Sequence, residues 1–174
     1  SLLFVPPAEG GGMEICMNKP YITKRHLVME ILSYVLLLVC FIIAIVGMAT
    51  LPDEIPTHFT MSGKIDGYGS PGTLLMLPII MLICNGMTSL IMHVMPPAMW
   101  NTPSKLKPQN AVRALQDIMS MITWMELEVS AFTLFFTICI YRGRDSGWLS
   151  MILFVGALTV TTVYYTVAFQ KHNK

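Results

Sequence analysis

Three long runs without a charged side chain constrain this 174-residue chain more than any other feature. They cover residues 31–52, 67–104 and 146–170, and each is rich in Leu, Ile, Val or Met. A helix rises about 1.5 Å per residue, so roughly 20 apolar residues cross the hydrocarbon core of a bilayer. The runs therefore predict membrane-spanning helices over residues 27–51, 73–95 and 148–169. The first run is too long for the apolar region of a signal peptide.

A fourth helix is predicted over residues 118–141, although Glu126 and Glu128 interrupt its apolar sequence. An acidic residue at the centre of a membrane helix costs about 2.5–3.5 kcal/mol on insertion scales, which the surrounding Leu, Phe, Ile and Met can outweigh. Overall composition agrees, because 54% of the residues are hydrophobic and 12% are charged, against about 25% charged in soluble domains. We therefore expect an all-α, polytopic four-helix bundle in the lipid bilayer.

The distribution of Lys and Arg predicts the orientation. Eight of the eleven lie before the first helix, between the second and third helices, or after the fourth. Only Lys64, Arg142 and Arg144 lie on the other side. The positive-inside rule then places both termini in the cytoplasm of a cell membrane and the loop between the first two helices outside. The balanced net charge of +1 gives no indication of nucleic acid as a partner.

The first twelve residues, Ser1 to Gly12, differ from the rest and end in three glycines before Met13. We interpret them as a remnant of added sequence or a linker, with a single membrane domain over residues 13–174. The four cysteines lack the spacing of a zinc site or a disulfide framework, and no phosphate-binding, HExxH or GxSxG motif is present. We expect no metal and no cofactor, and we favour a protein that is not an enzyme over an enzymatic alternative.

The loop from Leu51 to Pro71 is too polar and too rich in Gly and Pro for a lipid-facing helix. It predicts an ordered connection with turns at Ser62-Gly63 and Asp66-Gly67, where glycine allows a positive φ. His58 has two interpretations: a ring that hydrogen-bonds to Asp53, Glu54 or Asp66, or a metal ligand or pH-sensitive group. We favour the first, since one His among scattered carboxylates is weak evidence for zinc.

The same loop carries a long and unusual series of residues: Pro52, Pro56, Thr57, His58, Phe59, Gly63, Asp66, Gly67, Tyr68 and Gly69. In this series it resembles a bacterial domain of unknown biochemical function that forms the N-terminal part of SdpI-type immunity proteins. These proteins protect a producer cell against its own secreted toxin. The resemblance implies that the ten residues form a binding site for a ligand or partner. The sequence departs from the family at Pro71, where members often carry Lys, and it lacks the further helices and the Asn/Gly-rich motif expected in full SdpI-type proteins.

Glu126 and Glu128 are the second candidate site. A spacing of two places them about 200° apart around a helix, and no Lys or Arg lies at their depth. We expect both to face other helices and at least one to be protonated, because an unpaired carboxylate in hydrocarbon is costly. The expected hydrogen-bonding groups are Asn85, Thr159, Thr161 and Thr162. A contact between His93 and Asp117 is expected near the cytoplasmic rim.

Three hypotheses for function follow. The leading one is a small non-enzymatic SdpI-like membrane protein that binds, senses or confers immunity to a membrane-active toxin or peptide. The second is a transporter coupled to protons or cations through Glu126 and Glu128, working as a homo-oligomer. The third is an intramembrane or metal-dependent enzyme built from His58 and those carboxylates.

Overall fold

The computed structural model describes residues 19–174, and this part of the chain forms four helices long and apolar enough to cross a bilayer. The helices are α1 (Lys24–Thr50), α2 (Met76–Val94), α3 (Ala111–Tyr141) and α4 (Trp148–His172). The predicted all-α, multi-pass membrane fold is therefore confirmed. The predicted remnant at residues 1–12 lies outside the described residues.

Several helix ends differ from the predicted spans. α1 and α3 begin before the predicted residues, and α4 continues to His172. Charged residues mark where a helix leaves the hydrocarbon, but they do not end the helix. α1 instead begins where the Thr23 hydroxyl accepts a hydrogen bond from the His26 backbone N–H, which is a typical N-cap. α2 begins later than predicted, after a 3₁₀ turn over Pro71–Leu75.

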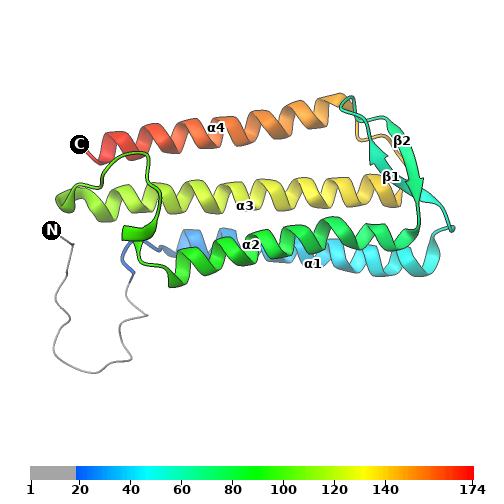
Figure 1. The fold of residues 1–174 in the computed structure, drawn as a ribbon, viewed down its shortest axis with the longest axis horizontal. Coiled ribbons are helices and arrows are strands. Elements are labelled where there is room, and N and C mark those ends of the chain that lie inside the picture. Colours follow the sequence, from blue (N-terminus) through cyan, green and yellow to red (C-terminus); the bar gives the residue numbers. More distant parts are fainter. Residues whose placement is uncertain (1–18) are drawn as a thin grey trace, which may run out of the picture.

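α3 lies at the centre of the arrangement (Figure 1). α1 and α3 run in the same direction and pack closely along their length, whereas α4 packs along the other side of α3. α2 lies beside α1 and α3. The segment that joins α1 to α2 covers one end of the helices, which we call the hairpin end, and the C-terminus lies at the opposite, terminal end.

Small and polar side chains form the contact between α1 and α3. Buried residues recur at alternating spacings of three and four on both helices, as in a parallel coiled coil. Small side chains allow two membrane helices to approach closely. We call this contact the α1–α3 seam; it includes Ser33, Leu37, Cys40, Ala44 and Gly47 of α1 and Ser120, Thr123, Glu126, Ser130, Thr133 and Thr137 of α3.

Three of the seam hydroxyls bond to carbonyls of their own helices. Thr133 donates to the carbonyl of Val129, and Thr137 donates to the carbonyl of Thr133. The Ser33 hydroxyl donates in the same way to the carbonyl of Met29. These hydroxyls can therefore be fully buried without a partner on the opposite helix, and the seam can close tightly.

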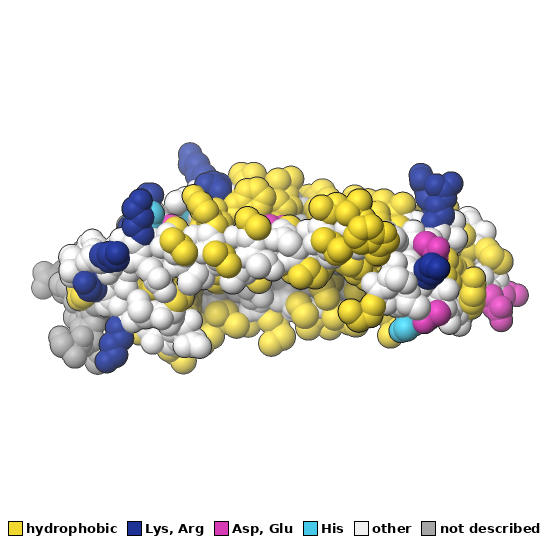
Figure 2. All heavy atoms as spheres, turned by 90° about the horizontal axis from the view of Figure 1, so that it is seen from above, with side chains coloured by type: hydrophobic (Ala, Val, Ile, Leu, Met, Phe, Trp, Pro, Cys, Tyr) yellow, Lys and Arg dark blue, Asp and Glu magenta, His cyan; other side chains and the backbone are white. Residues whose placement is uncertain are grey.

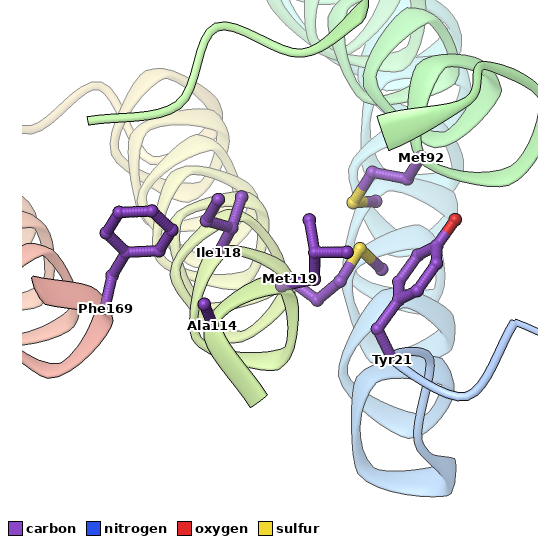
Figure 3. Packing of buried hydrophobic residues seen from close by; sticks show 7 residues of the cluster. Tyr21, Met92, Ala114, Ile118, Met119 and Phe169 are labelled. Atoms are coloured by element: carbon purple, nitrogen blue, oxygen red, sulfur yellow. The ribbon is translucent and has the colours of Figure 1, made fainter. Parts of the chain in front are cut away.

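Two apolar clusters lie at the ends of the helices. At the terminal end, Phe169 of α4 faces Ile118 of α3, while Met119 on the other side of α3 lies near Met92 and Tyr21 (Figure 3). At the hairpin end, Ala44, Ile55 and Leu74 form a smaller cluster that joins α1, the connecting segment and the turn before α2.

The outer surface of the helices is apolar. Large side chains such as Ile31, Leu38 and Val160 are more than half exposed. Figure 2 shows hydrophobic side chains along the middle of one face, with Lys and Arg side chains toward its two ends. Hydrocarbon chains of a bilayer can cover such a surface, whereas water cannot do so without a large cost in free energy.

Candidate functional site

The segment between α1 and α2 folds into a two-stranded antiparallel hairpin. Strand β1 (Ile55–Phe59) pairs with strand β2 (Ile65–Gly69), with register irregularities around His58. The predicted turn at Ser62-Gly63 is confirmed, because Gly63 has a φ of +76° and its N–H donates to the carbonyl of Thr60. The hairpin thus adds a small β element to an otherwise helical fold.

The predicted turn at Asp66-Gly67 is wrong, because both residues lie within β2. Gly67 does not have a positive φ. It pairs with His58 across the hairpin, and a Cβ atom at Gly67 would lie 2.9 Å from the Cβ of His58. Glycine is needed here because the two strands approach closely, and not because the chain turns. The Asp-Gly pair, which often marks a turn, therefore does not mark one at this position.

The structure brings the residues of the family motif together on this hairpin. Pro52 lies just before it and Gly63 lies in its turn, while the others lie on the two strands. Their assignment as a ligand or partner site stays a prediction. The strand residues are Pro56, Thr57, His58 and Phe59 on β1, and Asp66, Gly67, Tyr68 and Gly69 on β2.

Hydrogen bonds attach the hairpin to the turn between α3 and α4. The carbonyl of Gly63 accepts a hydrogen bond from the backbone N–H of Ser146 at 2.9 Å. The Asp145 carboxylate accepts a hydrogen bond from the N–H of Ile65 at 2.9 Å. Asp145 and Ser146 were not predicted as site residues. No local sequence pattern links the α3–α4 turn to the hairpin, which lies about eighty residues earlier in the chain.

Apolar contacts hold the base of the hairpin. Ile55 is 2% exposed and packs against Ala44 and Leu74. The ring of Phe59 packs edge-on against the ring of Phe136 in α3, with 4.9 Å between the ring centroids. Both ends of the hairpin are therefore fixed to the helices, and its position depends on how α1 and α3 pack.

The outward side of the hairpin is open. His58 Nδ1 lies 2.5 Å from an oxygen of Asp66, which confirms one of the predicted local partners. Within residues 19–174, no group of three His, Cys, Asp or Glu side chains is placed to hold a metal ion. The side chains of Met61 and Tyr68 are also strongly exposed, and the sequence analysis did not single out Met61.

Glu126 and Glu128 face different neighbours, as their spacing predicts. Glu128 accepts a hydrogen bond of 2.6 Å from the Thr161 hydroxyl of α4, one of the predicted donors. Glu126 is 6% exposed and lies beside α2, where both of its carboxyl oxygens lack a hydrogen-bond partner within the described residues. The structure therefore does not join the two carboxyls in one site, and neither lies near His58.

The other expected donors bind elsewhere. Asn85 donates to the Ser130 hydroxyl at 3.1 Å and not to either Glu. Thr159 and Thr162 donate to backbone carbonyls of their own helix. A hydroxyl can always reach the carbonyl one turn earlier, so its presence at the right depth does not predict an interhelical bond.

Two pairs of His and carboxylate side chains connect the helices at the terminal end. The expected contact between His93 and Asp117 is wrong. His93 instead lies 2.9 Å from Glu30 of α1, and Asp117 lies 2.6 Å from His172 of α4. Glu30 lies in the second turn of α1 and is buried beside α2. The first pair connects α1 to α2, and the second pair connects α3 to α4.

A family model described as a domain of unknown function, DUF1648, matches residues 35–82. The matched region includes most of α1, the whole hairpin and the start of α2. Comparison with curated proteins and with solved structures gave no match.

The close fit at Gly63 leads to a first prediction, for Gly63→Ala. A Cβ atom at this position would lie 2.6 Å from the backbone nitrogen of Gly147, in addition to the unfavourable positive φ. We expect the hairpin to detach from the α3–α4 turn, with faster amide exchange over residues 55–69. Hydrogen–deuterium exchange in detergent or nanodiscs measures this.

Gly143→Ala is the matched control. Gly143 also has a positive φ, of +59°, but a Cβ atom there would meet nothing within 4 Å. The Gly143→Ala variant therefore has the strain of the left-handed conformation, about 1–2 kcal/mol. It lacks the clash with a neighbouring backbone that Gly63→Ala would produce. Equal exchange in the hairpin of the two variants would contradict the proposed attachment.

Proposed function

We propose that this chain is a small, non-enzymatic, SdpI-like membrane protein that binds a membrane-active peptide at its hairpin end and so senses or confers immunity to it. One observation carries the proposal: the hairpin is firmly attached but presents apolar side chains outward. The exposed fraction is 93% for Met61 and 65% for Tyr68. These side chains are available to a partner at the membrane surface.

The chemistry of these side chains suits such a partner. Met and Tyr are enriched at the centres of protein interfaces because they bury a large area. The hairpin backbone is ordered before binding, so less conformational entropy is lost when a partner binds. A membrane-active peptide carries an apolar face and lies near the bilayer surface, which is where these side chains would meet it.

The family relationships support the same proposal. The matched domain of unknown function is found in SdpI-like proteins and, in this chain, spans the entire hairpin. The motif residues that resemble SdpI-type immunity proteins are the residues that build the hairpin. We therefore assign the hairpin, and not the helices alone, to recognition of the peptide.

The proposal requires the hairpin to face outward, toward a secreted peptide. Both termini would then be cytoplasmic. The positive-inside rule supports this orientation. Eight Lys and Arg residues lie in the first turn of α1 or α3, in the last turn of α4, or in the segments before α1, between α2 and α3 and after α4. Only three lie near the hairpin.

Labelling of single cysteines tests the orientation. Ser62 at the hairpin turn and Gln109 before α3 are both exposed. In a variant without native cysteines, Ser62→Cys should react with a membrane-impermeant maleimide on intact cells, and Gln109→Cys should react only after lysis. Labelling of Gln109→Cys on intact cells would contradict the proposed orientation.

A toxin challenge tests the function. A sensitive bacterial host that expresses the chain should survive a membrane-active peptide toxin of the class that SdpI-type proteins counter. Tyr68→Ser should lower the tolerated toxin concentration by roughly tenfold, as expected for loss of a central interface side chain. The measurement is growth across a toxin dilution series at equal protein level in the membrane.

Tyr164→Ser provides the matched control. Tyr164 has nearly the same exposed fraction, 64%, but lies on α4. We expect this variant to protect as well as the unchanged chain. The proposal is wrong if the unchanged chain gives no protection, or if the two Tyr variants lose protection equally.

A further inference from the structure

Glu126 differs from the two other buried acidic residues of the helices, because Glu30 is paired with His93 and Asp117 with His172. Glu128 is only half-buried, and one of its oxygens accepts a hydrogen bond from Thr161. Both carboxyl oxygens of Glu126 are buried and lack a partner within residues 19–174. A buried carboxyl group without a hydrogen-bond partner is costly, so such a group in a well-packed protein calls for a specific explanation.

Glu126 is one of the residues that line a cavity of about 280 Å³ between α2 and α3. Its walls are mostly apolar and include Met81, Ile122, Met125 and Val129. Glu126 lies midway along α3, so the cavity lies at the depth of the hydrocarbon core. Cys84 lines the cavity and is itself exposed, which indicates that the cavity is open to the bilayer beside α2.

None of the side chains in residues 19–174 donates a hydrogen bond to the Glu126 carboxyl group. The Asn85 amide, which also lines the cavity, donates to Ser130. The Thr88 hydroxyl donates to the carbonyl of Cys84. The chain has no Lys or Arg between residues 65 and 104 of the α2 region or between 114 and 141 of α3. The described residues thus leave the Glu126 carboxyl group without a donor or cation, and a ligand in the cavity can supply one.

We propose that the α2–α3 cavity is a binding site for a small lipophilic amine, whose ammonium group pairs with the Glu126 carboxylate. The ammonium group provides both the positive charge and the N–H donors that Glu126 lacks. The apolar body of the amine fills the space between the Met, Ile and Val side chains. The ligand enters from the bilayer, in which lipophilic amines dissolve.

The size of the cavity limits the ligand. An apolar cavity of about 150 Å³ accommodates benzene, so a cavity of about 280 Å³ fits a molecule with two fused rings and a short amine. This site is separate from the hairpin, and the inference does not depend on the proposed peptide recognition.

Binding of 1-naphthylmethylamine tests the proposal. The full chain is placed in nanodiscs of phosphatidylcholine and phosphatidylglycerol, which contain no lipid with a primary amine. Saturable binding is measured by the fluorescence of the naphthyl group. We expect binding to the unchanged chain, and weaker binding by about tenfold to a hundredfold for Glu126→Gln, because a charge-assisted hydrogen bond is lost.

The chain offers a matched control on the same helix. Glu128→Gln makes the same chemical change to a carboxyl group that faces α4 and does not line the cavity. It should bind the amine like the unchanged chain. The neutral analogue 1-naphthylmethanol should bind the unchanged chain much more weakly than the amine does.

Protection of Cys84 provides a second measurement. In a variant whose other cysteines are replaced by Ala, bound amine should slow the reaction of Cys84 with a membrane-permeant maleimide. Val129→Phe, which fills the cavity but keeps the carboxyl group, should abolish both binding and protection. The inference is overturned if no saturable binding occurs, if Glu126→Gln binds the amine as well as Glu128→Gln does, or if the alcohol binds as tightly as the amine.

Discussion

Close packing of the parallel helices α1 and α3 is the constraint on which the rest of the structure depends. In a bilayer the hydrophobic effect does not drive helices together, so association relies on close contact between small side chains. Ala44 and Cys40 of α1 are fully buried against α3, and the hydroxyls of Thr133 and Thr137 bond to their own helix. These two hydroxyls therefore need no partner on α1, so the two helices can approach closely.

Both candidate sites follow from this contact. At the hairpin end, α1 contributes Ala44 to the cluster that buries Ile55, and α3 contributes Phe136, which packs against Phe59. The hairpin is thus held over the ends of the same two helices. Glu126 lies within the seam on α3, but α2 packs less closely there and leaves a cavity that Glu126 helps to line. Tight packing of α1 against α3 thus holds the hairpin in place. Looser packing of α2 against α3 leaves the cavity between these two helices.

The sequence predicted the features that depend on one residue type or on a local pattern. Charge-free runs identify membrane spans because lipid cannot solvate charges, and Gly63 marks a turn that needs a positive φ. Partners across helices were predicted less well. Thr161 does bond to Glu128, but His93 pairs with Glu30 and not with Asp117. Depth in the membrane can be estimated from sequence, whereas rotation about each helix axis depends on packing. The alternating spacing of small and polar residues on α1 and α3 was the signal that could have revealed the seam.

A disulfide between the two seam helices is the most direct test of this account. The thiol of Cys40 lies in contact with the hydroxyl of Thr137. In a variant that retains Cys40 alone, Thr137→Cys should form a disulfide under mild oxidation. Cleavage at a protease site inserted between α2 and α3 would then leave the two fragments joined until reduction. Phe135→Cys, on a more exposed position of the same helix, should leave them separate. Separate fragments with Thr137→Cys, or equal joining with Phe135→Cys, would contradict the parallel α1–α3 seam.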